Sequence, residues 1–286
     1  SQTVILWTVQ CKLKNNKNGE KVAALNSSSW GGLLRLDKTD NNISVLLGAG
    51  ENGGVLETFN KDLKRTTFVG TTALGAGGIL TNDAAEQIRT DLGATGLKIF
   101  NVNEIQTSYL GNAEFGGALQ TYDNEGNART SLGTSSIGGL LTTHNANGKK
   151  SVLLGTADDG SGLLIGSTKN GDGAVFIGSN IDGGGILETT NSRGQKTAYL
   201  GSTEGGIGKL SIYNSSGKEI SYLGSGMDGS GHLTTYDAAG TKTVYLGTGK
   251  GGAGLMHTFN THGVMVGYFG TGVDEDGIAI LFDRYG

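Results

Sequence analysis

The 286-residue sequence contains no proline, a single cysteine and few charged side chains. With Cys11 alone, no intramolecular disulfide can form, and the simplest interpretation of this residue is a small nonpolar side chain in a strand. Charged residues make up 17% of the chain and the formal net charge is −4. No run of Lys or Arg supplies the basic footprint of a nucleic-acid-binding protein. We therefore expect no nucleic acid among its partners.

Long nonpolar segments are also missing. No stretch approaches the roughly 18 nonpolar residues of a membrane-spanning helix, so we expect no membrane span. Segment 1–13 is nonpolar but has neither a basic stretch nor a cleavage site, so it does not read as an attached signal peptide. The sequence does not begin with Met, which fits a signal peptide removed earlier, and we expect an extracellular or cell-surface location.

Glycine is abundant, with 53 residues, and it is regularly placed. No Gly-X-Y triplet repeats, so a collagen-like chain is excluded. Instead, one glycine ends a Leu-Gly or similar step every 23 residues, at Gly155, Gly178, Gly201, Gly224, Gly247 and Gly270. Two further columns keep the same period: Gly185, Gly208, Gly231, Gly254 and Gly277, and Asn191, Asn214, Asp237, Asn260 and Asp283. Such self-similarity indicates a repeat protein whose units stack on one another.

Each unit reads as two short strands joined by a turn. In the cleanest unit, 186–208, Leu187 and Thr189 alternate along the first strand and therefore share a face. The second strand ends at Leu200, and an Asn-x-x-Gly turn lies between the two strands. We predict an all-β, elongated β-solenoid of about twelve ~23-residue two-strand units. An antiparallel hairpin meander and a trimeric β-fibre remain alternatives.

The predicted domain organisation follows from the repeat. Residues 1–13 form an N-terminal docking strand, and 14–286 form one continuous array that ends in an incomplete unit, 278–286. Open strand edges recruit other chains. A surplus strand at one end and a missing strand at the other therefore favour head-to-tail joining of copies.

Catalytic and metal motifs are absent from the sequence. It contains no HExxH, no phosphate-binding GxxxxGK[ST] and no Ser/His/Asp set that stands out from the repeat, so we predict a protein that is not an enzyme and needs no cofactor. Acidic residues in the Gly-rich loops, such as Asp158, Asp159 and Asp228, allow Ca²⁺ as a possibility. No unit matches a calcium-binding repeat, and solvated turn residues are the simpler interpretation.

Two columns of side chains offer further interpretations. Aromatic residues recur once per unit, at Tyr199, Tyr222, Tyr245 and Tyr268 among others. They either stack across strands or form a stripe that meets another chain. A threonine column that includes Thr189 and Thr235 could present a flat array to ice or glycan, although its position beside leucine indicates an inward face. A surface glycan or receptor is thus a possible partner.

The repeat motif has a family resemblance. Asn214–Gly224 (NSSGKEISYLG) and Asn16–Leu25 (NKNGEKVAAL) carry an Asn/Asp-x-x-Gly-Lys-x4-Leu-Gly pattern. In this pattern the chain resembles bacterial extracellular tandem-repeat, β-solenoid-like surface and filament proteins, and it is more loosely similar to phage tail-fibre shafts. Both resemblances imply extracellular structural or adhesive work, and neither carries functional residues over.

We therefore predict a secreted structural subunit that polymerises head-to-tail, by N-terminal strand exchange, into an extracellular filament. Its partners would be copies of itself. The alternative is a phage-type trimeric tail-fibre or adhesin shaft. Main-chain bonds along an added strand would join the copies, and Trp7 would anchor the joint. The predicted subunit-interface residues are Ile5, Trp7, Val9, Cys11, Leu13, Ile278, Ile280 and Phe282.

Overall fold

The computed structural model describes residues 14–286 except 20, 39–41, 204, 227 and 250. The chain divides into two compact units, residues 1–134 and 135–286, which we describe in turn. The described residues form strands and turns and contain no helix. Among them there is accordingly no helical segment able to cross a membrane.

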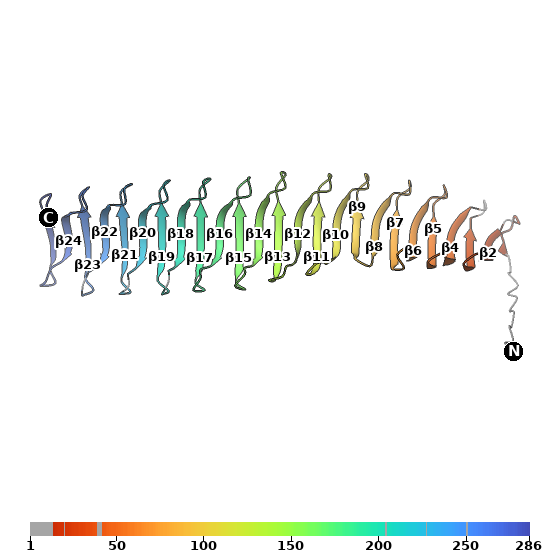
Figure 1. The fold of residues 1–286 in the computed structure, drawn as a ribbon, viewed down its shortest axis with the longest axis horizontal. Coiled ribbons are helices and arrows are strands. Elements are labelled where there is room, and N and C mark those ends of the chain that lie inside the picture. Colours follow the sequence, from red (N-terminus) through yellow and green to blue (C-terminus); the bar gives the residue numbers. More distant parts are fainter. Residues whose placement is uncertain (1–13, 20, 39–41, 204, 227, 250) are drawn as a thin grey trace, which may run out of the picture. The chain divides into compact units, whose positions relative to one another are not determined.

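The N-terminal unit is an antiparallel meander in which each strand pairs with the next along the chain (Figure 1). Its strands are β1 (Lys14–Asn15), β2 (Lys21–Ser28), β3 (Gly31–Asp37), β4 (Ile43–Gly50), β5 (Gly53–Phe59), β6 (Arg65–Thr71), β7 (Gly77–Asn82), β8 (Ile88–Gly93), β9 (Gly96–Phe100), β10 (Gln106–Ala113), β11 (Gly116–Tyr122) and β12 (Ala128–Thr134).

The C-terminal unit repeats the same arrangement with more uniform hairpins. Its strands are β13 (Gly139–His144), β14 (Lys150–Thr156), β15 (Gly162–Ser167), β16 (Gly173–Ser179), β17 (Gly185–Thr190), β18 (Lys196–Ser202), β19 (Gly208–Tyr213), β20 (Glu219–Ser225), β21 (Gly231–Tyr236), β22 (Lys242–Thr248), β23 (Gly254–Phe259), β24 (Met265–Thr271) and β25 (Gly277–Leu281).

The pairing confirms the all-β tandem repeat and decides between the two predicted windings. Leu187 pairs with Leu200 inside one hairpin, and Leu200 pairs with Leu210 of the next hairpin. In a solenoid, equivalent residues of successive units would lie on adjacent strands. Here Leu187 and its equivalent Leu210 are two strands apart. The expected coil is thus corrected to the hairpin meander, the alternative that the turn chemistry favours.

The Asn-x-x-Gly turn closes each hairpin through its own hydrogen bonds. Between β17 and β18, the backbone N of Gly194 donates to the carbonyl of Asn191 at 2.9 Å, and the Asn191 N donates to the Gln195 carbonyl at 2.8 Å. The Asn191 Oδ1 also accepts from the backbone N of Arg193 and of Gln195. Gly194 has φ of 74°, the left-handed conformation that ends a turn with a bulge. The side chain of Asn191 therefore fixes the hairpin and its register.

The glycine of the Leu-Gly step is required for a different reason: there is no room for a Cβ at this position. A Cβ on Gly201 would lie 2.6 Å from the Gly185 carbonyl oxygen and from Cγ2 of Ile186 on the neighbouring strand. A Cβ on Gly224 would lie 2.8 Å from the hydroxyl of Tyr222, two residues earlier. Glycine at this step thus lets a neighbouring side chain and the tyrosine ring lie flat on the sheet.

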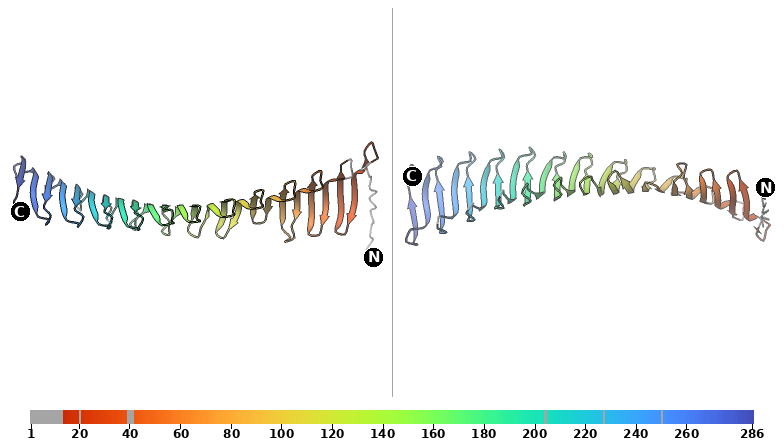
Figure 2. Two further views of the ribbon diagram at one scale, coloured as in Figure 1. Left: turned by 90° about the horizontal axis from the view of Figure 1, so that it is seen from above. Right: turned by 60° about the horizontal axis from the view of Figure 1, so that its bottom comes forward.

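The described strands of each unit form a sheet one layer thick, with no second layer of described strands on either face (Figure 2). Among the described residues, the buried hydrophobic side chains are only Ala24, Ala118 and Tyr199. Compact domains normally pack two or three layers around a hydrophobic core. The described residues of either unit therefore enclose no such core between layers.

The two roles of glycine can be separated by substitution. We expect Gly194→Ala to lower the free energy of unfolding by about 1 kcal/mol, because nothing lies within 4 Å of the new Cβ and only the left-handed backbone resists it. The matched control is Gly185→Ala, which has equal space and no left-handed φ and should change stability little. Urea unfolding followed by circular dichroism measures both. Equal losses in the two variants would contradict the backbone explanation.

Candidate interaction surfaces

One face of the C-terminal unit carries a continuous line of nonpolar side chains, one from each strand. Cross-strand pairing places them directly opposite one another, as in Leu200 with Leu210 and Leu223 with Leu233. We call this line the leucine ladder. It consists of Leu141, Leu154, Leu164, Ile177, Leu187, Leu200, Leu210, Leu223, Leu233, Leu246, Met256, Phe269 and Ala279.

The leucine ladder is open to solvent. Leu200 is 53% exposed, Leu223 52% and Phe269 63%. The N-terminal unit has an equivalent line with similar exposure, running through Leu25, Leu34, Leu47, Leu56, Val69, Ile79, Leu92, Leu97, Leu110, Leu119 and Leu132. Contiguous exposed nonpolar surface of this kind marks a contact site in soluble proteins.

The threonine column shares the leucine face, as the alternation predicted. Within each hairpin, two hydroxyls meet across the strands: Thr189 and Thr197 at 2.7 Å, and Thr235 and Thr243 at 2.7 Å. These hydroxyls bond one another instead of an outside partner. Because the sheet is open, the predicted inward direction does not exist, and the threonines border the leucine ladder.

The opposite face, which we call the aromatic face, covers itself. Each tyrosine that directly precedes the Leu-Gly or Phe-Gly step lies along its own strand, and its hydroxyl donates to a carbonyl three residues later, as Tyr199 does to Ser202 at 2.6 Å and Tyr222 to Ser225 at 2.8 Å. Rings then stack in a row with centroids 4.9–5.9 Å apart, in the order Tyr222, His232, Tyr245, His257 and Tyr268. The predicted local stacking of the aromatic column is thus what the structure shows.

Lysine side chains complete the cover of the aromatic face. The Lys196 Nζ lies 5.0 Å from the centroid of the Tyr199 ring and 2.7 Å from Oε2 of Glu188. The Lys209 Nζ lies 5.2 Å from the same ring. Tyr199 is consequently 9% exposed, and Ser211 beside it is fully buried. The two faces therefore differ: one is covered by its own side chains and the other is not.

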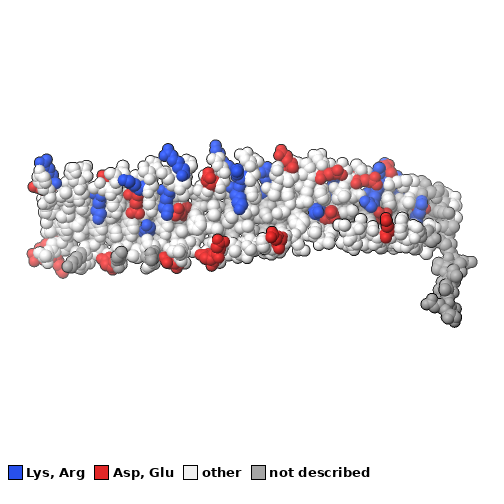
Figure 3. Space-filling model, in the orientation of Figure 1, with Lys and Arg blue, Asp and Glu red and all other residues white. Residues whose placement is uncertain are grey.

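The two edges of the C-terminal unit differ in charge (Figure 3). Turns that follow even-numbered strands form the acidic edge, whose described charged residues are Asp158, Asp159, Asp182, Asp228, Asp274, Glu275 and Asp276. Turns that follow odd-numbered strands form the basic edge, with Lys149, Lys169, Arg193, Lys218 and Arg284 beside Asp172, Asp237 and Asp283.

Two carboxylates of the acidic edge, Asp159 and Asp228, have pKa values lowered by hydrogen bonds. Hydrogen bonds from the side chain and backbone of Ser161 lower the pKa of Asp159, and bonds from the backbone and side chain of Ser230 lower that of Asp228. Within the described ranges, no three His, Cys, Asp or Glu side chains converge as a metal-binding group.

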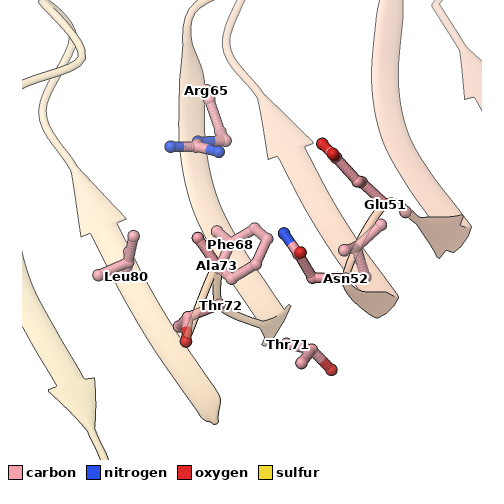
Figure 4. A pocket seen from close by; sticks show the side chains of 10 residues that line it. Glu51, Asn52, Arg65, Phe68, Thr71, Thr72, Ala73 and Leu80 are labelled. Atoms are coloured by element: carbon pink, nitrogen blue, oxygen red, sulfur yellow. The ribbon is translucent and has the colours of Figure 1, made fainter. Parts of the chain in front are cut away.

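A shallow hollow lies on the N-terminal unit, on the same face as Phe68 (Figure 4). The Arg65 guanidinium is 5.4 Å from the Phe68 ring centroid and donates to Glu57 Oε1 at 3.0 Å. Glu51 and Asn52 of the β4–β5 turn border the hollow. Its arginine is already engaged by a ring and a carboxylate, so the hollow is a packing feature of the sheet.

The sequence-predicted junction is described only in part. Ile5, Trp7, Val9, Cys11 and Leu13 lie outside the described residues. Strand β25 pairs with β24 and with no other described strand. Ile278 and Ile280 lie opposite Gly270 and Tyr268, hence on the aromatic face, and the Phe282 N donates to the Val266 carbonyl at 3.0 Å. Strand exchange at this junction stays a prediction.

The leucine ladder is the surface that the sequence interpretation missed. Leu200 and its equivalents were expected inside a coil, where stacked units would enclose them. The signal that favours their exposure is the Asn-x-x-Gly turn, because consecutive hairpins that do not close on themselves form an open sheet rather than a coil with an interior.

Comparison with known proteins assigns no family. No protein-family model and no curated protein matches the chain. Solved structures that align with it include TcdB2-TccC3 without its hypervariable C-terminal region and a Photorhabdus luminescens Tc holotoxin pore. Each is 10% identical, with TM-scores of 0.22 and 0.21, and covers 93% and 92% of this chain. This chain spans only 16% of either larger chain, and similarity at this level assigns no function.

The ring stack predicts a pH dependence. Burial lowers the pKa of His257 below its ordinary 6.5, and the nearby charge of Lys242 lowers it further. The neutral imidazole packs between Tyr245 and Tyr268. Because the folded pKa is depressed, the stability that His257 contributes is present above pH 6.5 and is lost as the pH falls through the folded value.

We therefore expect the thermal midpoint to fall between pH 7 and pH 5, and His257→Gln to flatten that fall. His262→Gln is the matched control, since His262 lies in an exposed turn away from the stack. Calorimetry of the three proteins across this range measures the effect. An unchanged pH slope in His257→Gln would exclude His257 as its source.

Proposed function

We propose that this chain is a structural subunit of an extracellular fibre, in which copies of the chain associate to cover their leucine ladders. The observation that supports it is the one-layer sheet with one uncovered nonpolar face. Full burial of a leucine contributes about 1.5–3 kcal/mol, so covering the half that is exposed would add roughly 1 kcal/mol for each one. Summed along a ladder, this is a substantial drive to associate.

A structural role also fits the polar side chains. In the turns, Asn and Asp side chains bond the backbone, as Asn214 Oδ1 does with the N of Ser216 and of Lys218. On the strands, Thr189 bonds Thr197 through their hydroxyls, and Lys196 packs on the Tyr199 ring. These polar groups serve the sheet itself, which is the use that a structural subunit makes of them.

The extracellular location rests on the sequence. The low charge and the resemblance of the repeat to bacterial surface and filament proteins favour it. Membership of that family, the strand exchange and an additional glycan or receptor partner stay predictions. Strand exchange would join copies end to end, whereas covering the ladders would join them face to face. The two modes are compatible.

The association can be tested on the purified chain. We expect light scattering to give a mass well above 29.3 kDa that persists on dilution, and negative-stain microscopy to show fibres. Sulfate should strengthen the association, because excluded salts favour nonpolar burial. An open-ended mass would indicate a filament, and a fixed mass of three chains the trimeric shaft. Monodisperse monomers across all salts and concentrations would refute the proposal.

A further inference from the structure

We propose that the leucine ladder of residues 135–286 is covered by the same ladder of another copy, with the two chains running in the same direction, so that the acidic edge of one lies beside the basic edge of the other. This inference rests on the proposed function and names the contact surface and its orientation. Three features of the C-terminal unit support it, and each is independent of the chain ends.

The first feature is the contrast between the faces. On the aromatic face, the rings of Tyr199 and Tyr222 lie flat, lysines lie over the Tyr199 ring and Ser211 between them is fully buried. On the ladder face, Leu200 and Leu223 stay half exposed. The lysines Lys196, Lys209 and Lys242 all lie near tyrosine rings, hence on the aromatic face. The ladder is thus the surface that lacks a cover.

The second feature is the period of the ladder. One large side chain recurs on every strand, at the strand separation of about 4.8 Å. A covering surface fits this line only if its own side chains repeat at the same interval, so that they interdigitate as two sheets do in a dry zipper. The same ladder of another copy has that period by construction. A lipid surface has none.

The third feature is the charge of the edges. Two ladders can face each other with the chains parallel, which places unlike edges together, or antiparallel, which places like edges together. In the antiparallel arrangement, the seven described acidic side chains of one copy would face the same seven of the other. Like charges at close range repel. In the parallel arrangement they face the basic edge, where five lysine and arginine side chains outnumber the three carboxylates Asp172, Asp237 and Asp283.

The contact surface is tested by the double variant Leu200→Lys/Leu223→Lys. Both positions are exposed in the single chain, so the fold should tolerate lysine, which circular dichroism checks. We expect the mass by light scattering to fall at least twofold, to that of a monomer. The matched control is Leu74→Lys, a leucine that is 95% exposed in a turn off the ladder, and its mass should stay that of the wild type.

The outcomes separate the two proposals. If the wild type assembles and the folded double variant assembles equally well, the ladder contact is wrong while the fibre proposal stands. If the wild type is monomeric, the fibre proposal itself fails. In a further experiment, lipid vesicles are added to the wild type and to the double variant. If the wild type then leaves its assemblies and binds the vesicles, and the double variant does not bind them, a lipid surface covers the ladder and the inference is wrong.

The orientation is tested by cross-linking in a Cys11→Ser background. Leu154→Cys and Phe269→Cys place one thiol near either end of the ladder. The two variants are mixed, co-assembled and treated with a short bismaleimide, and the cross-linked peptides are identified by mass spectrometry. Parallel chains give 154–154 and 269–269 links. A predominance of 154–269 links would establish the antiparallel arrangement and refute the inference.

Discussion

The structure depends on one constraint: the described strands of each unit form a single layer. Within the chain, a strand side chain can therefore be covered only by neighbouring side chains on the same face of the sheet. A second layer would normally bury one face of a sheet and supply most of its stability. Here the backbone pairing and the turns hold the sheet together, and the asparagine column fixes those turns. The glycine and tyrosine columns cover one of the two faces.

The aromatic face is covered by side chains of the chain itself. Glycine at the Leu-Gly step removes the Cβ that would strike the tyrosine ring, as at Gly224 and Tyr222. The ring then lies flat, reaches a carbonyl with its hydroxyl and covers the neighbouring strand. Lysines and histidines fill the remaining gaps between rings. A glycine-rich composition, which otherwise favours flexibility, here serves to bring side chains down onto the sheet.

Much of this fold was readable from the sequence. The Asn191–Gly194 turn, the paired strands and the shared face of Leu187 and Thr189 follow from turn chemistry and a period of two. The 23-residue columns left the winding open, because a coil and a meander both show them, and only the turn chemistry favoured the meander. Whether Leu200 lies inside or outside is also undecided by alternation, which separates two faces without saying what covers them. The order of the stacked tyrosine and histidine rings depends on side-chain conformations, which the sequence pattern does not specify.

The leucine face is the one that the described residues leave exposed. Its residues are as regular as those of the aromatic face, yet Leu200 and Leu223 stay about half exposed. A regular nonpolar line that one chain cannot cover is a line suited to a surface with the same period, and a repeat protein carries such a surface on every copy. The unlike charges of its two edges then favour one direction of approach. In this way a single-layer sheet links the repeat in the sequence to assembly, and the interior missing from one chain would form between several.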